Sequence, residues 1–157
     1  MKMSVIFEVG ALNCALPQRE IKEILAMPSL VLPPGMPAIL AGFVKLEDQY
    51  LPVVDLGRVF QQSPQPLTID QHLLRLAHHP WLCLVNRVLD LAQLSEPVPV
   101  NPGHSFNNCV SGLSSYQGCE IALLEISQLL LQEERLRMVA LQEILQARLS
   151  DLAPESP

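Results

Sequence analysis

Residues 42–56, GFVKLEDQYLPVVDL, decide the fold of this chain, because they predict two short β-strands joined by a tight polar turn. The apolar residues of the first strand are Phe43, Val44 and Leu46, and those of the second are Tyr50, Leu51, Val53 and Val54. Glu47, Asp48 and Gln49 lie between them and are the solvated residues with turn chemistry that a hairpin needs. The simplest interpretation is a hairpin in the protein core.

The second strand of this hairpin carries further predictions. Pro52 has no amide hydrogen, so its strand is expected to lie at a sheet edge or to bend there. Val53 and Val54 are consecutive β-branched residues, which favours a strand covered on both faces. Asp55 has no partner acid, base or metal-binding group nearby in the sequence. We interpret it as a strand-end or turn residue rather than a catalytic carboxylate.

The composition is that of a folded globular protein with an acidic net charge. Of 157 residues, 49% are hydrophobic and 17% are charged, and the net charge is −6. Without a basic run, such a chain is unsuited to binding phosphate backbones, so we expect no nucleic-acid partner. The N-terminal MKMSVIFEVG has too short an apolar run for a signal peptide, and no stretch approaches the ~18 apolar residues of a membrane helix. We therefore expect a cytoplasmic protein without direct membrane insertion.

The cysteines and histidines lack the spacing of a metal site, since there is no CxxC pair and no metal-ligand pattern. The sequence also contains no nucleophile motif, phosphate loop or dinucleotide-binding glycine pattern. We predict no catalytic residue, no metal site and no cofactor, and we expect the cysteines to be buried free thiols because apolar residues flank them. These residues are Cys14, Cys83, Cys109, Cys119, His72, His78, His79 and His104.

Many short strands at near-regular spacing predict an all-β fold made of barrels or a sandwich. A first unit is expected at about 3–60 and a second at about 68–126. The linker-like stretch QQSPQPL, residues 61–67, separates them. The proline-rich segments 27–38 and 95–108 are expected to be loops.

The C-terminal region changes character and predicts a helix from Ser127, an expected N-cap, to residue 152, because 127–152 contains no proline or glycine. Residues 153–157 are expected to be a frayed tail. The helix has two apolar stripes, whereas a surface helix normally needs one. Either one stripe packs on the body and the other on another molecule, or both pack on the same chain. The stripes are Met138, Leu141, Leu145, Leu149 and Leu152, and Leu136, Ala140, Ile144 and Ala147.

The hairpin resembles the signature of CheW-like domains, which run Gly, an aliphatic pair, a polar turn and then aliphatic-Pro-aliphatic-aliphatic-Asp-Leu. The resemblance covers roughly 3–131, within a domain that we place at 1–131, and its segments stand in the family's order and spacing. The matching residues are Gly42, Val44, Leu46 and 51–56 in the hairpin, 14–17 and 21–24 upstream, and 84–88 and 118–124 downstream.

This resemblance implies two small five-stranded β-barrels packed together, followed by the helix. It also implies a non-enzymatic adaptor in chemosensory signal transduction. In the family, one barrel binds the regulatory domain of a CheA-type histidine kinase, and the groove between the barrels grips the helical tip of a methyl-accepting chemoreceptor. Several of the matching residues could equally be ordinary barrel core, and Gly42 could serve close backbone approach or a positive φ. The protein-binding residues implied are Ile21, Glu23, Ile24, Gly42, Val44, Glu47 and Val88.

One departure from the family pattern concerns the hairpin turn, where the family has Asn-x-Arg-Gly and this chain has Lys-Leu-Glu-Asp at 45–48. Glu47 and Asp48 reverse the local charge, which disfavours a partner built for the arginine. Asn86 and Glu125 also stand where the family has aspartates. We therefore hypothesise a divergent scaffold of a non-flagellar or otherwise dedicated chemosensory array.

Two other functions fit the sequence. One is a small-molecule sensor or enzyme on the same barrels, with Cys83, His78 and Asp55 as the polar candidates in the cleft between them. The other is a self-associating structural protein that uses the C-terminal helix, with Leu141 and Leu145 as the contact in a dimer.

Overall fold

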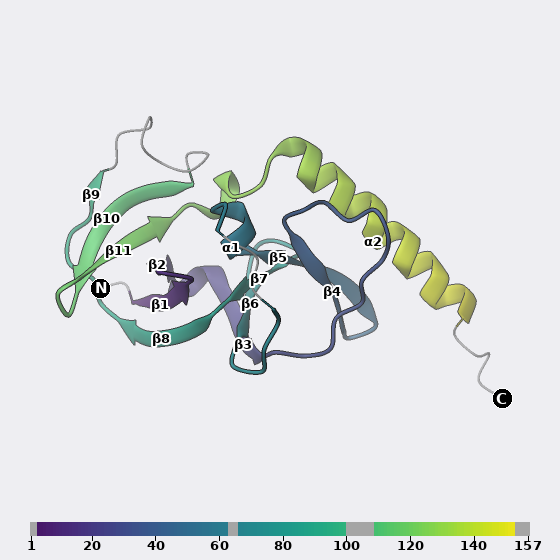
Figure 1. Cartoon of the computed structure of the whole chain (residues 1–157), viewed down its shortest axis with the longest axis horizontal. Coiled ribbons are helices and arrows are strands. Elements are labelled where there is room, and N and C mark those ends of the chain that lie inside the picture. The colour runs from purple at the N-terminus through teal and green to yellow at the C-terminus, as the bar shows by residue number, and fades with distance from the viewer. Residues whose placement is uncertain (1–2, 63–65, 100–108, 153–157) are drawn as a thin grey trace.

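The computed structural model describes residues 3–62, 66–99 and 109–152, with only the backbone described for 149–152. These residues form two β-sheets and a long C-terminal helix (Figure 1). The predicted fold class, all-β with a C-terminal helix, is confirmed. Part of the expected linker, part of the second expected loop and the expected tail lie outside the described residues, at 63–65, 100–108 and 153–157.

The two sheets contain six and five strands. Within each sheet the neighbouring strands are antiparallel, except for the parallel pairs β11·β2 and β5·β7. Among the described strands, no ladder joins the two ends of either sheet. In sheet order, the six are β8 (Arg87–Ala92), β1 (Ser4–Val9), β2 (Leu12–Pro17), β11 (Cys119–Leu124), β10 (Val110–Tyr116) and β9 (Val98–Pro99), and the five are β3 (Ile21–Ala26), β6 (His72–Leu76), β7 (Leu82–Val85), β5 (Gln49–Asp55) and β4 (Leu40–Leu46).

The sheets do not follow the expected division of the chain at 61–67, because each sheet contains strands from both sides of that segment. The chain crosses between sheets through the short helix η1 (Gln18–Glu20) and again at Asn86. The Asn86 side chain accepts a hydrogen bond from the Gly10 amide at 2.8 Å, and Gln62 donates one to the Val9 carbonyl at 2.9 Å. The turn after β1 is thereby tied both to the crossover and to the start of the expected linker.

The hydrophobic core has three parts. Adjacent residues of one strand point to opposite faces of the sheet and so belong to different parts. The largest cluster contains residues from both sheets, Phe7 and Val54 among them, and holds the sheets together. A second cluster belongs to the five-stranded sheet and includes Val53, and a third belongs to the six-stranded sheet and includes Ile6. Val53 and Val54 are fully buried, so the prediction of a strand covered on both faces is confirmed.

The predicted hairpin is formed by β4 and β5, with Glu47 and Asp48 alone in the turn. Both turn residues have positive φ, 50° and 66°, as in the two-residue turns that match the twist of paired strands. The expectation that the strand of Pro52 lies at a sheet edge is wrong, because β5 lies between β7 and β4. The parallel ladder from β5 to β7 begins at Val53, so the missing amide hydrogen of Pro52 lies just before it.

Gly42 lies at an irregularity of the β4–β5 ladder and has a φ of +154°, which residues with a side chain rarely adopt. A Cβ atom built on it would lie 2.9 Å from the Val31 carbonyl oxygen and 2.8 Å from Cδ2 of Leu32. Val31 also exchanges backbone hydrogen bonds with Phe43. Both expectations for Gly42, a close backbone approach and a positive φ, are confirmed.

The C-terminal helix begins later than predicted. Ile126–Gln128 form a 3₁₀ turn, η4, and α2 spans Gln132–Leu152. Between them Leu129 and Leu130 are buried in the main core. The Glu134 side chain accepts a hydrogen bond from the Leu131 amide at 2.8 Å and so caps the true start of the helix.

Polar contacts hold α2 against the β4–β5 hairpin. Gln142 donates to the Tyr50 carbonyl at 2.8 Å, Gln146 donates to the Asp48 carbonyl at 3.0 Å, and Arg137 donates to the Gly35 carbonyl at 3.0 Å. The position of the helix on the body is therefore fixed. Within the described ranges, no helix has the length and apolar composition that crossing a membrane requires.

We expect Gly42→Ala to lower the free energy of unfolding by about 2–4 kcal/mol, because the new methyl group adds a clash to an unfavourable φ. Chemical denaturation measures this change. Gly118→Ala is the matched control, since Gly118 has a φ of +79° but nothing within 4 Å of its added Cβ, and we expect it to cost about 1–2 kcal/mol. Equal losses in the two variants would contradict the role given to the contact with 31–32.

We expect one fast-reacting thiol in the folded protein at pH 8 and four after unfolding, as measured with a chromogenic disulfide reagent. Cys14, Cys83 and Cys109 are buried and only Cys119 is exposed. Burial raises the pKa of Cys14 to about 12 and also raises the pKa of the other two buried thiols, so little reactive thiolate forms at these sites. Cys119→Ser should abolish the fast phase, and a fast phase that survives it would mean that the core opens readily.

Candidate partner-binding groove

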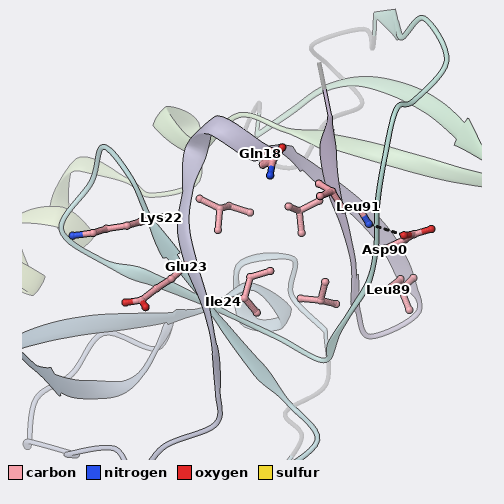
Figure 2. Close-up of a pocket in the computed structure, with 10 residues that line it drawn as sticks. Gln18, Lys22, Glu23, Ile24, Leu89, Asp90 and Leu91 are labelled. Atoms are coloured by element: carbon pink, nitrogen blue, oxygen red, sulfur yellow. Dashed lines mark hydrogen bonds between the residues drawn. The ribbon is translucent and has the colours of Figure 1, made fainter. Parts of the chain in front are cut away.

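A groove of about 380 Å³ lies where the edge strands of the two sheets face each other. One wall is β3, the outermost strand of the five-stranded sheet, and the other is β8, the outermost strand of the six-stranded sheet (Figure 2). The two crossovers of the chain, at η1 and Asn86, lead directly into these strands. The groove is therefore built by the same feature that interleaves the two halves of the chain.

Four of the predicted binding residues line this groove. Ile21, Glu23 and Ile24 come from β3, and Val88 comes from β8. Ile24 is 44% exposed, so the alternative of ordinary barrel core does not hold for it, whereas Ile21 and Val88 also pack against the main core. Val88 therefore lines the same groove as the three β3 residues, although more than sixty positions separate it from them in the sequence.

The groove residues that were not predicted from the sequence include two exposed leucines of β8, Leu89 and Leu91, which are 41% and 44% exposed. The run Val88-Leu89-Asp90-Leu91 has apolar residues pointing to both sides of its strand. That pattern is the sequence signal by which the two leucines could have been found. It indicates an exposed apolar surface only if β8 is an edge strand, and the local sequence does not show that.

Charged side chains lie at the rim of the groove rather than on its floor. Figure 2 shows Ile24 extending from β3 toward β8, while Lys22 and Glu23 point away from the groove on the other side of β3. On the opposite wall, Asp90 accepts a hydrogen bond from the Tyr116 hydroxyl, which lowers the pKa of the carboxyl group and keeps it ionised. The result is an apolar slot between charged edges, suited to an amphipathic segment.

Glu47 lies apart from the groove but is linked to its rim through Arg75 of β6. The Arg75 guanidinium is 3.0 Å from the Glu23 carboxylate and 3.7 Å from that of Glu47. Glu47 also lines a second hollow of about 650 Å³, between the hairpin turn and α2, together with Asp48 and Glu143. The Glu47 carboxylate thus has a half-buried cation beside it, and the surface that the turn presents is acidic.

Gly42 and Val44 do not reach the groove. Val44 is buried inside the five-stranded sheet, and the loop at 30–32 covers Gly42. Their match to the family pattern therefore reflects packing in this structure.

The hypothesis that Leu141 and Leu145 form a dimer contact does not fit their position in the structure. Leu141 is 4% exposed and Leu145 packs beside it against the main core, so both face the body of the protein. Of the second stripe, Leu136 is 62% exposed and Ile144 is 51% exposed. One stripe on the body and the other facing outward is the arrangement that the structure has.

The polar residues considered for a sensor or enzyme do not converge on a site. Cys83 is fully buried in the main core, where desolvation raises its pKa. Asp55 accepts a hydrogen bond from the Gly57 amide at 2.9 Å and pairs with Arg58 at 3.3 Å, so it caps the helical turn α1 (Leu56–Val59), as its predicted turn role requires. His78 is exposed in the loop after β6. Among the described residues, no group of His, Cys, Asp and Glu could hold a metal ion.

Comparison with known proteins agrees with this architecture. The model of the CheW-like domain family matches residues 4–134. Among solved structures, the crystal structure of the scaffolding protein TtCheW from Thermoanaerobacter tengcongensis is similar in fold, with a TM-score of 0.72 and 19% sequence identity over 79% of this chain and 88% of that chain. No curated protein matches the sequence at a significant level. Because the family model spans far more than half of its residues, the chain belongs to the CheW-like domain family.

Proposed function

We propose that this chain is a non-enzymatic adaptor of a cytoplasmic chemosensory system, in which it couples a methyl-accepting chemoreceptor to a CheA-type histidine kinase. Membership of the CheW-like family supports the adaptor role. The observation that carries the proposal is the apolar groove between β3 and β8, with Ile24 and Leu91 exposed on its two walls. In this proposal the helical tip of the receptor occupies the groove, and the kinase binds one of the two sheets.

An amphipathic helix suits this groove because its apolar face can cover the exposed leucine and isoleucine side chains while its polar face stays in water. The ionised Asp90 lies at one edge of the groove, where a charged group guides orientation more than it adds affinity. Among the described residues that line the groove, there is no convergent acid, base or nucleophile that would favour a chemical reaction instead.

The acidic charge of the hairpin turn supports the proposal that the binding partner differs from the usual one of the family. Glu47 is 76% exposed, and its carboxylate, with Asp48 beside it, replaces the arginine expected there. Because Arg75 already pairs with Glu23 and Glu47, the acidic turn is stable within the chain itself. We therefore propose a kinase or receptor with cationic residues facing this turn, as in a dedicated, non-flagellar array.

We expect Ile24→Glu and Leu91→Glu each to weaken binding of the receptor's cytoplasmic helical fragment at least about tenfold, or ~1.4 kcal/mol, because each places an unpaired carboxylate against an apolar partner. Titration with purified receptor and kinase fragments from the source cell measures this effect. Ile69→Glu is the control, since Ile69 is 89% exposed and lies outside the groove. If the wild-type chain binds neither fragment, the adaptor proposal fails. If Ile69→Glu weakens binding as much as the groove variants, the site is misplaced.

We expect Glu47→Arg to weaken binding of the native partner several-fold, and to do so less at high salt, because a cation would then face a cationic surface. Glu47→Gln separates loss of the carboxylate from reversal of charge and should have a smaller effect. Both changes are at the surface, and we expect the free energy of unfolding to change by less than about 1 kcal/mol. Unchanged binding in Glu47→Arg would show that the turn is not an interface.

A further inference from the structure

The outer face of α2 is an apolar surface that the rest of the described chain leaves open. Its outer stripe, defined as Leu136, Ala140, Ile144 and Ala147, lies opposite the residues that pack on the core. Figure 1 shows α2 running along the flank of the hairpin. Because glutamine and arginine contacts fix α2 on the body, the outer stripe is presented without further ordering.

The charges of α2 differ from those of the chain as a whole. The chain has a net charge of −6, which opposes contact between two copies over most of its surface. Residues 132–148 are neutral, because three carboxylates balance three guanidinium groups, namely Glu133, Glu134 and Glu143 and Arg135, Arg137 and Arg148. This part of the helix, residues 132–148, is therefore a surface on which two copies can meet without net repulsion.

The outer stripe and its charged neighbours are complementary to themselves when two helices pack antiparallel. A two-fold axis next to Ala140 places Leu136 of one copy opposite Ile144 of the other, and the small alanine side chains at the centre allow the helices to approach closely. The same arrangement brings Glu133 of one copy to Arg148 of the other, twice per pair. Within one chain these two residues are roughly 22 Å apart along the helix and cannot pair.

We propose that the protein forms a two-fold symmetric dimer through antiparallel packing of α2 on α2. A second copy fits this surface because a single register matches apolar with apolar and acid with base on both helices at once. The groove is lined by residues of β1, η1, β3 and β8, whereas α2 packs on β5, so the dimer keeps both grooves open. Such a dimer is a bivalent adaptor, although the proposal does not depend on what the groove binds.

Sedimentation equilibrium of the full chain over a range of concentrations tests the apolar part of this contact. We expect the wild type to show a dimer whose fraction rises with concentration, and Leu136→Glu/Ile144→Glu to remain monomeric with an unchanged melting temperature. Both side chains are more than half exposed, so the double variant should fold. Ile69→Glu, which also places a charge at an exposed apolar position, should leave the dimer intact. A wild type that is monomeric up to about 1 mM, or a dimer that survives in the double variant, overturns the proposal.

Charge reversal tests the antiparallel register. We expect Glu133→Arg and Arg148→Glu, each alone, to weaken the dimer about threefold to tenfold, because each replaces two attractive pairs with two repulsive ones. Combining the two changes should restore wild-type dissociation. That rescue cannot arise within one chain or through contact with an unrelated partner. Failure of the rescue, with both single variants weakened, would overturn the proposed register.

Discussion

The structure depends on strands that bury both of their faces. In β5, Val53 packs inside the five-stranded sheet while Val54 packs between the sheets, and in β1 Ile6 and Phe7 divide in the same way. Such strands cannot carry a polar face, which accounts for a composition that is nearly half hydrophobic. The rule is broken at the edge strands β3 and β8, whose apolar residues have cover on one side only. The candidate groove is the direct result.

Predictions from sequence succeeded where the determinants are local. The turn at Glu47 and Asp48 and the double burial of Val53–Val54 follow from adjacent residues. The interior position of Pro52 could not be predicted in the same way, because it depends on where β7 begins, thirty residues later. The helix start was misplaced because the chain at Ser127 first forms a 3₁₀ turn and then places Leu129 and Leu130 in the main core, before α2 begins at Gln132. Strand β9, at Val98–Pro99, was missed because it exists only through pairing with β10.

The residues of the candidate groove could be predicted in part from local sequence and in part only from long-range contacts in the fold. Resemblance to the family indicated Ile21, Ile24 and Val88, but only the fold brings β3 and β8 together and adds Leu89 and Leu91. Val44 and Gly42 match the same family pattern yet serve packing, so a motif residue can be structural, and residues that line the groove can lie outside the motif. The acidic turn is a third case. Its charge was visible in the sequence, whereas its link to the groove rim through Arg75 required the structure.

The interleaving of the two halves of the chain has a consequence for biosynthesis. Strands β1 and β2 emerge from the ribosome first, but their neighbours in the sheet are β8 and β11, which end at Ala92 and Leu124. Until those strands are made, the apolar faces of the first hairpin have no strands or side chains to pack against. The sheet therefore cannot form by adding strands in the order in which they are synthesised. The protein therefore has to mature late, nearly all at once, and its nascent N-terminal hairpin is the segment that most needs protection from aggregation.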